Sequence, residues 1–128
     1  AKGNSMFISE ELIGNRLEET LKEMKEKLPL LLTKEDYIYE LANYYYDLIV
    51  IHPFREGNGR TIREFMREFV LEMNKYISFG TFELDWSKTT KEDLLAATRE
   101  MYMFKTKMVE EFKKMMIPLE EKEVFTRN

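Results

Sequence analysis

The residues best suited to chemistry lie together at positions 52–63, in the sequence HPFREGNGRTIR. This stretch holds the only histidine of the chain, a carboxylate, two glycines around an asparagine, and three arginines. Glycines at the start of a helix let backbone N–H groups approach an anion closely, so positions 57–59 predict an anion-binding turn. Arg60 and Arg63 follow one helical turn apart and add two permanently charged donors, which favours a polyphosphate ligand.

Glu56 and His52 complete a candidate reaction site beside this turn. Glu56 offers a hard oxygen ligand, and Mg2+ is usually held by one or two carboxylates, waters and substrate phosphates. A neutral imidazole at His52 could take the proton from an attacking hydroxyl near neutral pH. Each group also has an ordinary structural explanation, such as a core histidine or a helix charge pair between Arg60 and Glu64. Their conjunction in one short stretch favours the chemical interpretation.

Two predicted helices hold this stretch at their junction. One helix is predicted to start after Thr33, which forms a capping pattern with Asp36, and to become apolar all round at positions 48–51. An all-round apolar segment indicates a central, buried helix. It ends directly before His52, so the imidazole is held at the end of a rigid element. The next helix is predicted to begin at position 58 or 59.

The remaining elements are less regular. Positions 1–9 combine turn-forming residues with a short apolar run, which predicts a strand or loop. Other predictions are a helix over 10–27 with Ser9 as N-cap, irregular structure over 74–90, a helix capped by Thr90, an amphipathic helix ending before Pro118, and a charged, loosely held tail over 119–128.

Composition limits the classes of function. A chain of 128 residues suits a single domain. Its net charge of -4 argues against a general nucleic-acid-binding protein, and the absence of cysteine excludes a disulfide framework or a thiolate zinc site. No apolar run approaches the roughly 20 residues that span a bilayer. We therefore expect a cytoplasmic protein without nucleic-acid or membrane partners.

The central stretch resembles the signature of the Fic (filamentation induced by cAMP) family, H-x-F-x-D/E-G-N-G-R-x-x-R, at every fixed position. The resemblance implies an all-α, Fic-type helical bundle and a protein adenylyltransferase, which moves AMP from ATP to a Ser, Thr or Tyr hydroxyl of a target protein and releases pyrophosphate. The implied roles are His52 as the base, Phe54 as a core anchor, Glu56 as the Mg2+ ligand, Gly57, Asn58 and Gly59 as the anion hole, and Arg60 and Arg63 on the distal phosphates. The intact G-N-G matters, because Doc-type relatives with altered motifs bind ATP in reverse and act as kinases.

A weaker resemblance lies at the N-terminus. Lys2, Gly3 and Asn4 are similar to the second strand of the family's flap hairpin, which in relatives positions the target hydroxyl. This implies a short β-flap remnant over 1–9 and a truncated Fic domain over 1–128. Family members are also commonly restrained by a helix bearing S/T-x-x-x-E-G/N, and the sequence has no match to it. An inhibitory partner, an inhibitory helix in a longer protein, or no restraint would each account for this.

Several alternatives to AMP transfer stay open. The enzyme could use UTP, GTP or a phosphocholine-bearing nucleotide as donor, or it could catalyse deAMPylation. The chain could also be an inactive or regulatory nucleotide-binding fragment, because the implied flap is incomplete. A purely structural helical domain is the remaining interpretation.

Overall fold

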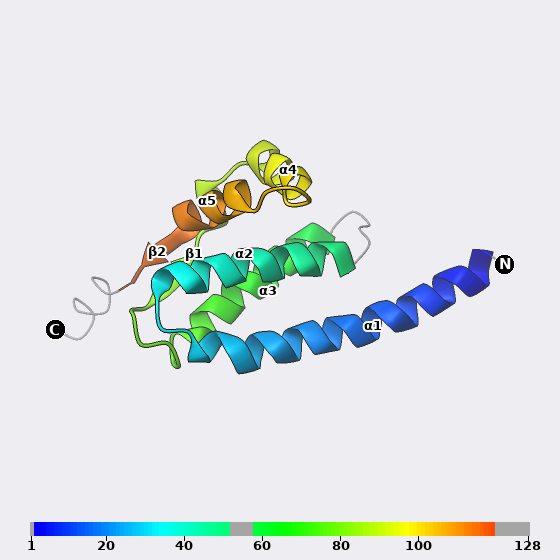
Figure 1. The fold of residues 1–128 in the computed structure, drawn as a ribbon, viewed down its shortest axis with the longest axis horizontal. Coiled ribbons are helices and arrows are strands. Elements are labelled where there is room, and N and C mark those ends of the chain that lie inside the picture. Colours follow the sequence, from blue (N-terminus) through cyan, green and yellow to red (C-terminus); the bar gives the residue numbers. More distant parts are fainter. Residues whose placement is uncertain (1, 52–57, 120–128) are drawn as a thin grey trace.

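The structure is a computed structural model that describes the backbone of residues 2–51 and 58–119, and the side chains of residues 14–51 and 59–119. Over these residues the chain is mainly helical (Figure 1). The elements are α1 (Lys2–Lys27), η1 (Leu28–Leu30), α2 (Lys34–Ile51), α3 (Asn58–Met73), β1 (Phe82–Leu84), η2 (Trp86–Lys88), α4 (Lys91–Glu100), α5 (Thr106–Met115) and β2 (Met116–Pro118). This confirms the predicted all-α fold class.

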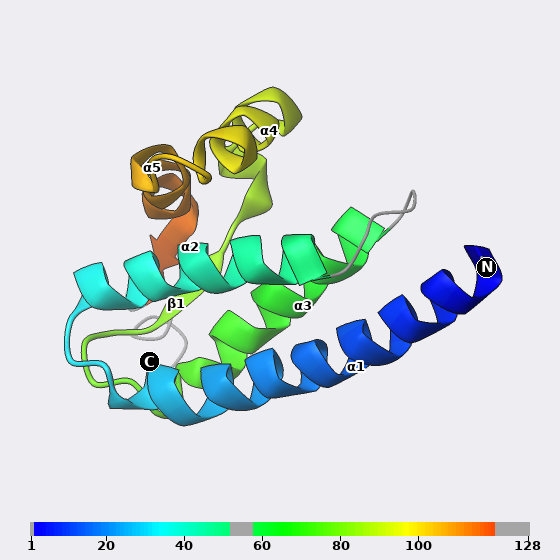
Figure 2. The same cartoon turned by 45° about the vertical axis from the view of Figure 1, so that its right-hand side comes forward.

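Helix α2 lies at the centre of this arrangement. It contacts α1, α3 and α5, and both views place α1 on one side of α2 and the α4–α5 pair on the other (Figures 1 and 2). Tyr44 of α2 donates a hydrogen bond to Glu23 of α1 over 2.9 Å, next to the fully buried Met24. The buried residues of α2 are Tyr37, Ile38, Leu41, Ala42, Tyr44, Tyr45, Leu48 and Ile51.

The prediction that α2 is buried all round at its end is wrong in part. Leu48 and Ile51 are buried, but the Val50 side chain is 56% exposed. The helices around α2 cover only some of its faces, so one apolar position in the last turn faces outward. The apolar composition of the last turn of α2 therefore predicted more burial than the structure shows.

Local chemistry explains the predicted helix ends that the structure confirms. The Asp36 N–H donates to Thr33 Oγ1 over 3.1 Å, and the Asp93 N–H donates to Thr90 Oγ1 over 3.0 Å. Both hydroxyls satisfy an amide in the first helical turn that has no partner within its helix. Helix α1 ends at Lys27, and Pro29 lies in the short 3-10 turn that follows. The predicted start of α3 at position 58 or 59 is also confirmed.

The predicted strand or loop at the N-terminus is wrong. Residues 2–9 belong to α1, which continues without a break through the predicted N-cap at Ser9. A lone strand would leave its backbone groups unpaired, whereas each residue added to an existing helix gains a backbone hydrogen bond. The helix propensity cost of Gly3 is only about 1 kcal/mol. A flap strand therefore does not form over residues 2–9, the part of this segment that the structure describes.

Irregular structure was predicted over 74–90, but this segment contains β1. Strand β1 pairs antiparallel with β2, with Glu83 opposite Ile117. The Asn74 side chain supports the pairing, because its amide donates to the Phe82 carbonyl over 2.8 Å and accepts from the Phe82 N–H over 2.9 Å. The pairing brings α5 and the segment after α3 together. Of the predicted tail, only Leu119 is described.

Candidate functional site

The candidate motif lies at the junction between the end of α2 at Ile51 and the start of α3 at Asn58. Residues 52–57 lie outside the described part of the chain, and so does the Asn58 side chain. The roles expected for His52, Phe54, Glu56, Gly57 and Asn58 therefore stay predictions. The structure does describe Gly59, Arg60 and Arg63 in the first turns of α3.

Gly59 and Arg63 lie against each other. They are four residues apart in α3, so they share a face of the helix. A β-carbon added at Gly59 would come within 3.0 Å of Arg63 Nη1. The missing side chain at Gly59 therefore provides the space that the guanidinium occupies. Arg60 is exposed on the same helix.

The backbone of Arg63 is held by Trp86, which lies in the segment between β1 and α4. The Trp86 indole N–H donates to the Arg63 carbonyl over 3.0 Å. The Arg63 guanidinium also lies near Tyr45 of α2. Burial raises the pKa of the Tyr45 hydroxyl to about 12, and the nearby guanidinium opposes this increase. Tyr45 is thus a neutral hydroxyl at physiological pH. These contacts place the guanidinium between α2 and the segment before α4.

An aromatic cluster joins α2, η2 and α5. The ring centroids of Tyr45 and Trp86 are 5.2 Å apart, those of Tyr45 and Phe112 5.5 Å, and those of Trp86 and Phe112 5.8 Å. Separations of this size give aromatic pairs a favourable interaction beyond the area that they bury. The cluster fixes η2 against α2 and α5. Sequence reasoning did not identify Tyr45 or Trp86 as site residues, although Trp86 is the only tryptophan of the chain.

Glu111 of α5 holds the residues between η2 and α4 in place. Its side chain is buried, and it accepts hydrogen bonds from the Thr89 hydroxyl over 2.6 Å and from the Lys114 ammonium over 2.8 Å. Burial alone would raise the pKa of Glu111, but the hydrogen bonds from Lys114 and Thr89 hold the pKa of this carboxyl below its usual value. The ionised carboxylate therefore ties the segment before α4 to α5.

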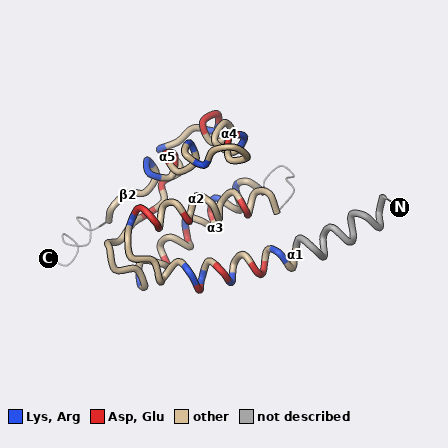
Figure 3. Tube along the Cα trace, in the orientation of Figure 1, with Lys and Arg blue, Asp and Glu red and all other residues tan. Residues whose placement is uncertain are grey.

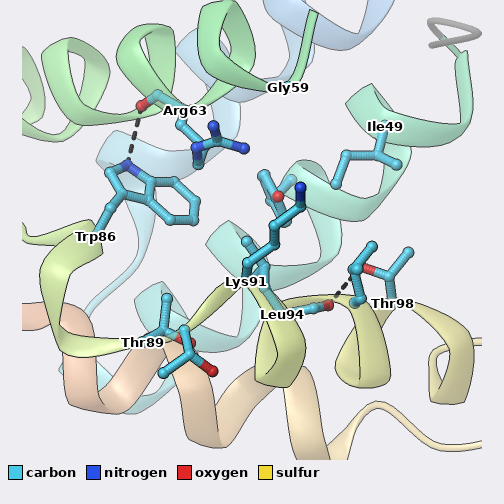
Figure 4. A pocket seen from close by; sticks show the side chains of 11 residues that line it. Ile49, Gly59, Arg63, Trp86, Thr89, Lys91, Leu94 and Thr98 are labelled. Carbon is cyan, nitrogen blue, oxygen red and sulfur yellow. Dashed lines mark hydrogen bonds between the residues drawn. The ribbon is translucent and has the colours of Figure 1, made fainter. Parts of the chain in front are cut away.

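Helices α2, α3 and α4 and the segment that contains η2 line a pocket of about 530 Å³ (Figure 4). That volume lies within the range of small-molecule sites. Helix α3 contributes Gly59 and Arg63, and α4 contributes Lys91 at its first residue. The apolar part of the wall comes from Ile49, Trp86, Leu94 and Leu95, and hydroxyl groups come from Tyr45, Thr89, Thr90 and Thr98. Two of the predicted site residues thus share a pocket, whereas the exposed Arg60 is not part of its lining.

Charge on the helices is mixed, so any preference for anions is local. Each of the helices α1 to α5 carries both acidic and basic residues (Figure 3).

In the part of the chain that the structure describes, no helix is long and apolar enough to cross a membrane. The predicted flap residues Lys2, Gly3 and Asn4 begin α1 instead of a strand.

A comparison with protein-family models matches residues 1–70 to the Fic/DOC family. The chain belongs to the Fic/DOC family. A solved structure agrees: the N-terminal Fic domain of a putative cell filamentation protein, a VirB-translocated Bep effector protein from Bartonella quintana, has a TM-score of 0.71 and 27% identity. The match covers 89% of this chain and 51% of that one. The predicted Fic-type fold is therefore confirmed.

Curated relatives of this Fic chain are named as protein adenylyltransferases. The chain is 37% identical over 62 residues to protein adenylyltransferase VbhT of Bartonella schoenbuchensis, a match that covers 48% of this chain and 12% of the relative. It is 28% identical over 99 residues to the probable protein adenylyltransferase Fic of Escherichia coli, covering 77% of this chain and 48% of the relative. The chain thus spans less than half the length of these two relatives. At the level of the family, the relatives support nucleotidyl transfer.

Proposed function

We propose that this chain transfers AMP from ATP to a Ser, Thr or Tyr hydroxyl of a target protein and releases pyrophosphate. The observation that carries the proposal is the placement of Gly59 and Arg63, both from the family motif, in a pocket of ligand size at the start of α3. A helix start favours anions, because its amide N–H groups point outward and its dipole is positive there. Relatives named as protein adenylyltransferases support the same chemistry.

In the proposed reaction, the target hydroxyl oxygen attacks the α-phosphorus of ATP. The new P–O bond forms as the bond between the α-phosphorus and the bridging oxygen breaks, and the electron pair leaves with pyrophosphate. His52 accepts the proton of the attacking hydroxyl. Only a neutral imidazole can do this, so transfer should weaken in acid.

The motif residues after His52 bind the phosphates in this proposal. The backbone at 57–59 lies against the phosphate chain, and Arg60 and Arg63 neutralise its distal end. Arg63 is suited to this role, because Gly59 leaves room for its guanidinium inside the pocket. The forked guanidinium matches phosphate oxygens better than an ammonium does, so Arg63→Lys should bind ATP more weakly than the wild-type chain.

Glu56 is the residue that we propose as the Mg2+ ligand. The donor set fits this ion, because a single carboxylate beside a phosphate site is a common way to hold Mg2+. In the part of the chain that the structure describes, no group of three or more carboxylate or imidazole side chains could hold a metal. When bound, Mg2+ would neutralise charge on the phosphates. Localisation in the cytoplasm and an inhibitory partner also stay predictions.

Two labelled nucleotides test the proposal. ATP labelled at the α-phosphate or at the γ-phosphate is incubated with Mg2+, cell lysate and the wild-type chain, His52→Ala or the control Lys88→Gln, whose position lies outside the pocket lining. We expect labelling from the α-label that is present with wild type and Lys88→Gln and absent with His52→Ala, and no difference among the three proteins with the γ-label. Labelling from the γ-phosphate that depends on His52 would indicate a kinase instead. Labelled UTP and GTP in the same assay test the donor.

One observation favours a second candidate, a nucleotide-binding module without transfer activity. Residues 2–9 are helical, so the strand expected to position a target hydroxyl is not formed. Calorimetry separates the two candidates. ATP binding that survives His52→Ala and is lost in Arg63→Ala, together with no transfer by wild type, would support the second candidate.

A further inference from the structure

Most polar groups on the pocket wall already have partners within the protein. These groups are threonine hydroxyls and the indole N–H, and each of them takes part in a hydrogen bond within the protein. The Thr90 hydroxyl accepts from the Asp93 N–H, the Thr89 hydroxyl donates to Glu111, the Thr98 hydroxyl donates to the Leu94 carbonyl, and the Trp86 indole donates to the Arg63 carbonyl.

Two cations remain in the same wall. Figure 4 shows the Arg63 guanidinium and the Lys91 ammonium directed into the same space, from α3 and α4 respectively. Within the described residues neither side chain belongs to an ion pair, and none of the pocket-lining residues is acidic. Glu92 and Asp93 follow Lys91 in α4 but do not line the pocket.

Two like charges that share a pocket repel each other until an anion binds between them. The rest of the wall is apolar or already hydrogen-bonded, so the ligand needs a strongly charged anionic end and little other polarity on this side. A polyphosphate chain has this character. Gly59 at the start of α3 lines the same pocket, next to the turn that is proposed above to bind the phosphates.

We propose that Lys91 is a further phosphate-binding residue, which binds the distal phosphates of the nucleotide together with Arg63 and so selects a nucleoside triphosphate. This inference rests on the proposed function. During AMP transfer the departing pyrophosphate gains the electron pair of the broken bond, and a cation beside it stabilises that charge. Lys91 lies outside the family motif, which ends at Arg63.

Calorimetry with ATP, ADP and AMP, in the presence of Mg2+, tests the role of Lys91. The proteins are wild type, Lys91→Gln, Lys91→Arg and the control Lys88→Gln. We expect Lys91→Gln to weaken ATP binding by about tenfold, the loss for one charge-assisted hydrogen bond, and to change AMP binding by less than about twofold. Lys91→Arg should restore most of the ATP affinity, and Lys88→Gln should change neither affinity.

The inference is wrong if Lys91→Gln leaves ATP affinity unchanged, if it weakens AMP as much as ATP, or if the wild-type chain binds no ATP. The α-label assay, run in parallel, separates this failure from failure of the proposed function. If AMP transfer occurs but does not depend on Lys91, the proposed function stands and the inference about Lys91 is wrong. If ATP binding depends on Lys91 but no His52-dependent transfer occurs, the inference stands and the proposed function is wrong.

Discussion

Replacing Gly59 with alanine should separate the stability of α3 from the position of Arg63. The added β-carbon would lie 3.0 Å from Arg63 Nη1. Comfortable contact between non-bonded heavy atoms begins near 3.5 Å, so the guanidinium must move by about 0.5 Å. It can do so without disturbing the backbone, because it is the end of a flexible side chain.

The free energy of unfolding should not fall in this variant. Alanine is favoured over glycine in a helix by about 0.5–1 kcal/mol, and the gain is smaller near a helix end. Binding should respond differently, because displacement of a charged donor costs about 1.5–3 kcal/mol when its hydrogen bond to the ligand is lost. We therefore expect ATP affinity to fall by roughly ten- to a hundredfold.

Gly14→Ala is the matched control. Gly14 is also helical, and an added β-carbon there would meet nothing within 4 Å. This variant should raise stability by about 0.5–1 kcal/mol and leave ATP affinity unchanged. Calorimetry gives the affinity, and urea unfolding gives the stability. Unchanged ATP binding in Gly59→Ala, or destabilisation by more than about 1 kcal/mol, would refute the reasoning about Gly59 and Arg63.

Three further predictions concern the groups around Arg63. Trp86→Phe keeps an aromatic ring, smaller than the indole, and removes the hydrogen bond to the Arg63 carbonyl, so unfolding in urea should show a loss of at least about 1 kcal/mol, and calorimetry should show weaker ATP binding. The folded pKa of Glu111 is lowered, so its contribution to stability is present above pH 4.5 and is lost as pH falls below that value. Glu111→Gln should therefore lose less stability than wild type between neutral and acid pH. Identical acid-unfolding curves for the two proteins would contradict the role given to the Glu111 carboxylate. Chelation of Mg2+ should abolish transfer, and Glu56→Ala should do the same with Mg2+ present; transfer that survives both changes would contradict the role of Glu56.

Features that depend on neighbouring residues were predictable from the sequence. The hydroxyl caps at Thr33 and Thr90 each act on an amide three residues later, so their pattern is visible in a short window. The same holds for the start of α3 after the glycine turn. The contact between Gly59 and Arg63 follows a local rule as well, because residues four apart share a helix face.

Features that depend on distant residues were not predictable in this way. The bond between Trp86 and the Arg63 carbonyl joins residues 23 positions apart, and no local pattern encodes it. Strands β1 and β2 are three residues each, too short for an alternating pattern to identify them. The exposure of Val50 likewise depends on which neighbours pack on α2. Composition alone does not determine it.

The central claim is that an adenylyl group is transferred with His52 as the base. Intact-mass spectrometry of the modified protein after incubation with ATP and Mg2+ tests it most directly, because adenylyl and phosphoryl groups differ in mass. We predict the added mass of one adenylyl group per modified hydroxyl with the wild-type chain, and no added mass with His52→Ala. The added mass of a phosphoryl group, or equal adenylyl transfer by His52→Ala, would contradict the claim.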